Sequence, residues 1–293
     1  MLRIVKAELY KLFKNRTFRV LCGVTIVLSI MMMAMSSPFM EDVMVDSLGD
    51  ISVEEKEAIL SQMGAMTYEE QVVTPGKMGL NLVAKDPMNP TALEIYHSSF
   101  GAGLIEILIG ILIAGFLAKE YSEGTIKNTL AYGKKRHEFY IAKFLAMIVG
   151  VAILTACLIS ISTIGSTIIN GWGQTFELSQ ILGMLQSFVA SIFANSAVIA
   201  IIMIFAILIK SNGGTIAITA GLFILAPMII SFFYGIYPWF DKIYELTPFY
   251  NSSLATSIYV GNGDLMRSIM IAAVTIVIAL MAGIQIFKAQ DIK

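Results

Sequence analysis

Long apolar runs alternate with polar segments along the whole chain. Six of these runs are expected to form membrane-spanning helices, at residues 18–36, 98–118, 139–169, 181–209, 215–234 and 268–287. A helix needs about 20 mostly apolar residues to cross the hydrocarbon core of a bilayer. The pattern therefore predicts an all-α polytopic membrane protein with about six transmembrane helices, of which the fifth is kinked or interrupted at Pro227.

The polar segment before the first run, residues 1–16, has the pattern of an amphipathic helix. One face of this helix holds Leu2, Val5, Leu9, Leu12 and Phe13, and the other holds Arg3, Lys6, Lys11 and Lys14. Basic residues near anionic lipid headgroups contribute about 1 kcal/mol each, so we expect the helix to lie in the membrane interface. The alternative is that these charges only set the topology of the first span.

Two segments between the runs are expected to face the outside of the cell. Residues 37–97 carry 11 acidic residues and only three lysines, which predicts a water-facing acidic insert. Within it, Ser52 with Glu55 predicts the start of a short helix, which we place at Ser52–Met63 and end at Gly64. Thr91 with Glu94 gives the same start signal just before the second span. Residues 235–267 are rich in aromatic side chains, which suit the membrane interface or a re-entrant segment.

Composition and charge narrow the class of protein. The chain is 57% hydrophobic and 14% charged, which excludes a soluble globular enzyme. With a net charge of −1 and no basic tract, it has no feature that would bind nucleic acid. Of the 20 Lys and Arg residues, 15 fall on the side of the N-terminus and five on the other. The positive-inside rule then places both termini in the cytoplasm of a bacterial plasma membrane.

Glu106 is the one carboxylate well inside a predicted span. Gly103, Gly110 and Ala114 share its helix face, and small residues at this spacing allow helices to approach closely. We therefore expect Glu106 to point into the helix bundle, because an ionised acid in the hydrocarbon core costs a few kcal/mol unless it is shielded. Both a role on a substrate path and a purely structural hydrogen bond remain open for it.

The polar segment 119–138 follows the second span on the cytoplasmic side. Gly124 and Gly133 bracket one short helix, in which Ile126 and Leu130 share a face at a spacing of four residues. These two side chains would form an apolar knob surrounded by charge, suited to a groove on another protein. The alternative is a solvated loop that only sets topology.

These two cytoplasmic segments resemble parts of a known family, the permease subunits of type-2 ABC exporters, in particular those that confer immunity to bacitracin and lantibiotics. The stretch from Glu8 to Arg16 is similar to the elbow helix of that family. The resemblance of the second segment rests on Glu120, Glu123, Gly124, Thr125, Ile126, Lys127, Asn128, Gly133 and Arg136. It implies that this segment is the coupling helix that contacts an ATPase. It also implies a permease dimer, formed with a second copy or a related chain.

Motifs of other protein classes are missing from the sequence. There is no G-x-x-x-x-G-K-[ST] phosphate loop, so ATP and magnesium are expected on a separate ATPase chain. There is no His-Glu-x-x-His, and His97 and His137 are predicted to lie on opposite sides of the membrane. A metalloprotease or a Ser-His hydrolase is therefore disfavoured.

The reading favoured by the sequence is a subunit that exports an amphipathic peptide, an antibiotic or a lipid-like substrate. A second reading is an immunity or sensor protein that does not transport and binds a cationic peptide through its acidic outer insert. A third, an ion-coupled transporter, calls for more intramembrane charge than Glu106 supplies, and for internal repeats.

Overall fold

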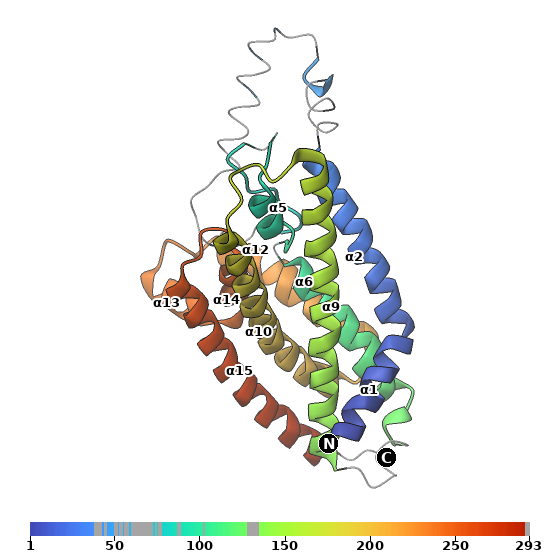
Figure 1. Cartoon of the computed structure of the whole chain (residues 1–293). Coiled ribbons are helices and arrows are strands. Elements are labelled where there is room, and N and C mark those ends of the chain that lie inside the picture. Colours follow the sequence, from blue (N-terminus) through green and yellow to red (C-terminus); the bar gives the residue numbers. More distant parts are fainter. Residues whose placement is uncertain are drawn as a thin grey trace.

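The chain folds as a bundle of helices in a computed structural model (Figure 1). The structure describes residues 1–37, 43, 46–49, 52, 55, 59, 73, 75, 78–86, 89–101, 103–127 and 135–290. All the regular elements among these residues are helices. Five helical stretches are long and apolar enough to cross a membrane: Arg16–Met35, Arg136–Asn170, Leu178–Ile209, Asn212–Ser231 and Asn262–Ala289. The all-helical membrane class predicted from the sequence is confirmed.

Asn15 separates the first two helices, α1 (Leu2–Lys14) and α2 (Arg16–Met35). Its backbone is extended, and its side-chain oxygen accepts a hydrogen bond from the Phe18 N–H, which caps α2. Its side-chain nitrogen donates to the Gly115 carbonyl at 3.1 Å. A single polar residue thus ends one helix, starts the next and ties both to a distant segment.

The second predicted span begins later than expected. Helix α5 (Ala92–Ser98) starts at the predicted capping box of Thr91 and Glu94 but ends at Ser98, where the span was expected to begin. The next helix, α6 (Leu104–Ile113), starts after Gly101 and Gly103, which both have left-handed backbone torsions, with φ of 64° and 70°. It continues through the π-helical turn η1 (Ala114–Ala118) into α7 (Lys119–Ser122).

The remaining helices follow the other apolar runs. They are α9 (Arg136–Asn170), α10 (Leu178–Ile209), α11 (Asn212–Ala220), η2 (Gly221–Leu225), α12 (Ala226–Ser231), α13 (Pro238–Glu245), α14 (Pro248–Thr256) and α15 (Asn262–Ala289). Pro227 lies directly after the π-helical turn η2, which is the interruption that was predicted, because proline offers no N–H to the preceding turn. The aromatic segment 235–267 contains α13, α14 and the start of α15.

Small side chains allow the helices to approach closely. Ala190, Ala194 and Ala197 on α10 are fully buried, and α10 packs along α14 and α15. Gly110 on α6 faces Thr219 on α11 so closely that a Cβ atom at this position would overlap the threonine side chain. Of the predicted contact face, Glu106 and Gly110 lie on α6 and are buried, whereas Gly103 precedes the helix and the buried Ala114 begins η1.

The N-terminus and the end of α15 lie at the same end of the bundle (Figure 1). At this end, the Arg136 guanidinium donates hydrogen bonds to the carbonyls of Phe287, Lys288 and Gln290 at 3.1, 2.9 and 2.6 Å. These are backbone acceptors that the last turn of α15 leaves without intrahelical partners. Arg136 holds the end of α15 in this structure, and its predicted contact with an ATPase stays a prediction.

The outer insert lies mostly outside the described residues. The predicted capping box is present, since Ser52 Oγ accepts from the Glu55 N–H at 3.3 Å and the Ser52 N–H donates to Glu55 Oε2 at 3.2 Å. Most of the predicted helix Ser52–Met63, with Gly64, is not among the described residues.

Candidate functional site: a buried charge cluster and a membrane cavity

A buried lysine joins three helices at the end of the bundle that holds the N-terminus. Lys143 Nζ on α9 lies 2.7 Å from Glu8 Oε2 on α1 and 2.8 Å from Glu120 Oε1 on α7. The Lys143 side chain is 0% exposed and that of Glu8 is 1% exposed. Because this ammonium is removed from water, it depends on these two carboxylates for its stability.

Further contacts complete the cluster. Lys143 Nζ donates to the Phe116 carbonyl at 3.3 Å and lies 3.7 Å from the centre of the Phe116 ring, a cation–π distance. Lys11 on α1 lies 2.7 Å from Glu8 Oε1 and 3.6 Å from Glu120 Oε1. Burial by itself lowers the pKa of Lys11, but Glu8 and Glu120 more than offset this effect, and the pKa is raised. Two carboxylates thus face two ammonium groups.

The cluster connects the chain's surface to its interior. Glu120 Oε1 contacts the fully buried Lys143, whereas Lys119, Ser122 and Glu123 nearby in the chain are exposed. A cavity of about 240 Å³ adjoins the cluster. It is lined by Lys11, Asn15, Gly115, Phe116, Lys119, Glu120, Glu123 and Thr125. A force applied to this part of the surface would therefore reach α1 and α9 through two ion pairs.

The predicted coupling residues do not share one environment. Glu123, Thr125 and Lys127 are exposed, and Gly124 has a left-handed backbone with φ of 67°, as the bend after α7 requires. Leu130 and Gly133 lie outside the described residues. The structure therefore leaves a surface of residues 122–127, formed by the side chains of Ser122, Glu123, Thr125 and Lys127, accessible to a partner.

Ile126 does not form the exposed knob that the sequence predicted. Its side chain is 1% exposed and belongs to the main apolar core of this chain. An apolar residue ringed by charges fits two environments, a groove on a partner or the chain's own core, and here it occupies the core. Any contact with an ATPase must then use its exposed neighbours.

The face that helix α1 buries is not the apolar face predicted from the sequence. Ile4, Glu8 and Leu12 face the bundle, whereas Leu2 and Phe13 are exposed. Of its predicted interface residues, Arg3, Lys6 and Lys14 are exposed, and Lys11 joins the charge cluster. The exposed apolar and basic side chains keep α1 compatible with a place at the membrane surface.

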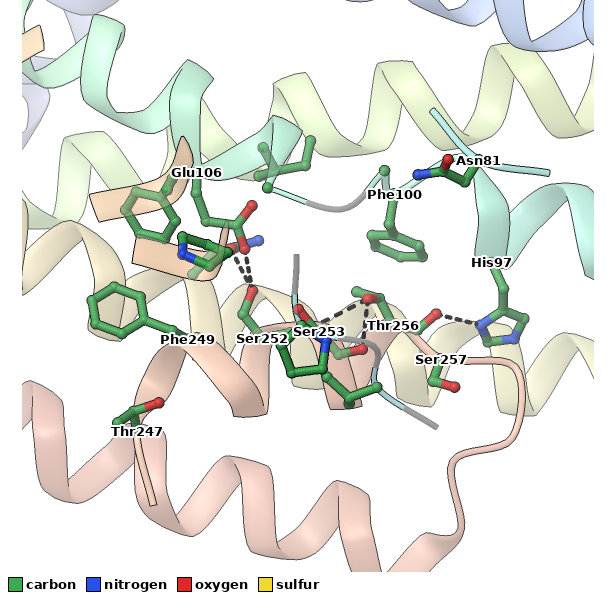
Figure 2. Close-up of a pocket in the computed structure, with 18 of the residues that line it drawn as sticks. Asn81, His97, Phe100, Glu106, Thr247, Phe249, Ser252, Ser253, Thr256 and Ser257 are labelled. Atoms are coloured by element: carbon green, nitrogen blue, oxygen red, sulfur yellow. Dashed lines mark hydrogen bonds between the residues drawn. The ribbon is translucent and has the colours of Figure 1, made fainter. Parts of the chain in front are cut away.

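A second site lies toward the other end of the bundle. It is a cavity of about 390 Å³ between α5, α6, α12 and α14. Figure 2 shows Glu106 at one end of the cavity and His97 at the other. Glu106 is 6% exposed, and its Oε1 accepts a hydrogen bond from Ser252 Oγ at 2.5 Å. The expectation that Glu106 points into the bundle is confirmed.

His97 has a defined tautomer in this cavity. Its Nδ1 lies 3.0 Å from the Thr256 carbonyl, and a carbonyl can only accept, so Nδ1 carries the proton. Burial lowers the pKa of His97 to about 4, although the Thr256 hydrogen bond acts in the opposite direction. The imidazole is therefore neutral at physiological pH, and its Nε2 is a hydrogen-bond acceptor.

Sequence reasoning missed the pairing of Glu8 with Lys143. From the sequence, Glu8 was assigned only to the segment that resembles an elbow helix. Lys143 was only counted among the 15 Lys and Arg residues on the cytoplasmic side. The available signal was a lysine near the start of the third apolar run, because a charge in an apolar run needs a partner if it is buried. The partner itself lies on another helix, which no local pattern reveals.

The described fold is that of a helical membrane protein. It has several apolar helices of spanning length, a charged cluster at one end and, toward the other, a mainly apolar cavity that contains the buried Glu106. The chain belongs to the ABC-2 transporter family, whose model matches residues 2–292. Family membership makes it the permease component of an ABC transporter, with an ABC ATPase subunit as its partner. A search of curated proteins found no match to this chain.

Proposed function

We propose that this chain exports an amphipathic peptide, an antibiotic or a lipid-like molecule across a bacterial plasma membrane. In this proposal both termini lie in the cytoplasm, and a sixth span is formed by α6, η1 and α7. ATP and magnesium bind to the partner ATPase. The Lys and Arg distribution and the shared position of the N-terminus and the end of α15 support this orientation (Figure 1).

The observation that carries the proposal is the ion pair between Glu120 and Lys143. Glu120 lies next to the exposed surface of residues 122–127, which is our candidate contact for the ATPase. When the ATPase closes on nucleotide, it pushes this surface, and the ion pairs pass the movement to α1 and α9. The membrane helices then change their packing and expose the path to the opposite side of the membrane.

A dimer of permeases would supply the complete path. Helix α15 keeps a large apolar face exposed, formed by Met266, Met270, Val274, Val277, Ile278 and Met281. Helix α2 exposes another, formed by Val20, Val24, Val27, Ile30 and Met31. In our proposal one of these faces packs against a second copy or a related permease, and the other faces lipid.

The test is co-purification of an ATPase from native membranes with the wild-type chain and with a charge-swapped variant. In Glu123→Lys/Lys127→Glu the net charge of the segment is unchanged and only the charge pattern differs. We expect the variant to lose at least tenfold of the bound ATPase. The control is Lys242→Glu, a change at an exposed residue of α13, outside the proposed contact surface.

Equal recovery of the ATPase by all three proteins would contradict the proposed contact surface. The alternative function, a sensor that binds a cationic peptide without transport, makes a different prediction. In that case protection of cells against the peptide would persist after the ATPase is deleted. If the chain is an exporter, deleting the ATPase should abolish this protection.

A further inference from the structure

Three acidic side chains are buried in the described helices. Glu94 accepts hydrogen bonds from the backbone N–H groups of Lys85 and Thr91. The other two lie at two places that differ in one respect. Glu8 has a counter-charge within the chain, because Lys143 lies 2.7 Å away. Glu106 is buried as well, and among the described residues no lysine or arginine pairs with it. Leaving a buried carboxylate without a cation is costly, so the second place calls for an explanation.

Burial of Glu106 favours its neutral form, and two features of its surroundings act in the opposite direction. Ser252 donates a hydrogen bond to its Oε1. Glu106 also lies in the first turn of α6, where the helix N-terminus stabilises negative charge. Hydrogen-bond donors and the helix dipole both stabilise the carboxylate more than the neutral acid.

The cavity wall around Glu106 is rich in acceptors and aromatic rings. Asn195 is buried beside Ser252, with its Oδ1 3.4 Å from Ser252 Oγ, and at the far end of the cavity neutral His97 offers Nε2 as an acceptor (Figure 2). The rings of Phe100, Phe223, Tyr244 and Phe249 line the same space. No lysine or arginine occurs among the lining residues that the structure describes. The volume of about 390 Å³ falls within the range of small-molecule sites.

We propose that this cavity binds the ammonium group and adjoining hydrocarbon of a cationic amphiphile, with Glu106 as the counter-ion. The ammonium N–H groups would donate to Glu106 and to the neighbouring acceptors, and the hydrocarbon would pack against the aromatic rings (Figure 2). This inference rests on the proposed export function, because it assigns a charge and a size to the end of the cargo that is bound.

The test uses three water-soluble probes with one skeleton: 4-phenylbutylamine, 4-phenylbutanol and 4-phenylbutyrate. Each is titrated into the purified full-length chain in lipid nanodiscs near pH 7, with isothermal titration calorimetry as the readout and empty nanodiscs as the blank. We expect the amine to bind at least tenfold more tightly than the alcohol, and the acid to bind most weakly. Equal affinity of amine and alcohol would overturn the proposal, since it would mean that Glu106 is not a counter-ion.

A variant locates the site. Glu106→Gln keeps the size and the hydrogen-bond acceptor but removes the charge, so we expect it to reduce the amine affinity at least tenfold and to leave the alcohol unchanged. The matched control is Glu245→Gln, which removes a carboxylate that pairs with Arg267 outside the cavity, and it should bind the amine as the wild type does. Unchanged amine affinity in Glu106→Gln would place the amine elsewhere and overturn the assignment.

The binding experiment gives an answer even if a variant does not fold or no ATPase is recovered. If Glu106→Gln does not fold, the ranking of the three probes on the wild-type chain still decides for or against a cationic ligand. The measurement also needs no ATPase. Failure to recover an ATPase would therefore contradict the proposed function alone, and failure to prefer the amine would contradict only the ligand class.

Discussion

The Lys143 ammonium lies 2.8 Å from the Glu120 carboxylate, and this contact joins a fully buried position on α9 to the segment with the exposed residues Glu123, Thr125 and Lys127. On the other side, the same ammonium contacts Glu8 of α1. Since α1, α7 and α9 meet at one atom, none of them can shift far without breaking an ion pair. A buried ion pair of this kind fixes a unique arrangement more than it adds stability.

The first prediction concerns removal of the shared cation. Lys143→Met leaves the buried Glu8 with Lys11 as its one remaining counter-charge among the described residues, and breaking a buried pair costs up to about 3–5 kcal/mol. We expect a clear fall in the midpoint of thermal unfolding of the purified chain. The double variant Lys143→Met/Glu8→Leu removes both charges and should recover most of the loss. If the double variant is no more stable than the single one, the pair is not the source of the effect.

The second prediction separates ATP hydrolysis from transport. Glu120→Gln removes one of the two carboxylates on Lys143 but leaves Glu8 in place, so the chain should still fold. We expect the assembled transporter to keep its ATPase activity while transport falls at least tenfold, because the surface segment is no longer tied to α9. Lys119→Gln is the control, since Lys119 makes only an exposed pair with Glu123. Full transport by Glu120→Gln would rule out this route of coupling.

The third prediction tests the close contact between α6 and α11. Gly110→Ala adds a Cβ that overlaps the Thr219 side chain, and overpacking of this kind costs about 1–3 kcal/mol. We therefore expect a lower unfolding midpoint. Adding Thr219→Ala opens the space that the new methyl group needs, so the double variant should be more stable than Gly110→Ala alone. Additive losses in the two single variants would show that the residues do not touch.

The helices were predictable from the sequence to a large extent, because apolar runs and capping residues are local signals. The capping box at Thr91 and Glu94 and the inward direction of Glu106 were confirmed. The predicted start of the second spanning helix at residue 98 was wrong, because Gly101 and Gly103 interrupt the second apolar run. A hydropathy pattern does not register such a break when the flanking residues are apolar.

The charge cluster could not be predicted, because it depends on contacts between helices that are distant in the sequence. A helical face also shows which residues lie together without showing what covers them. For this reason Ile126 was expected at a partner's surface, whereas it packs in the chain's own core. The burial of Glu8 escaped prediction for the same reason, since it lies on the face of α1 that meets α9.

The last prediction is a pH dependence that originates at His97. Burial holds the pKa of His97 at about 4 in the folded chain, below the value of about 6.5 expected in the unfolded chain. Between these two values the unfolded state binds the extra proton, so stability is full above about pH 6.5 and falls by up to about 1.4 kcal/mol per unit as the pH drops toward 4. His97→Gln removes this titration, and its unfolding midpoint should fall less steeply between pH 6.5 and 4 than that of the wild type. Parallel profiles for the two proteins would show that His97 does not titrate with folding.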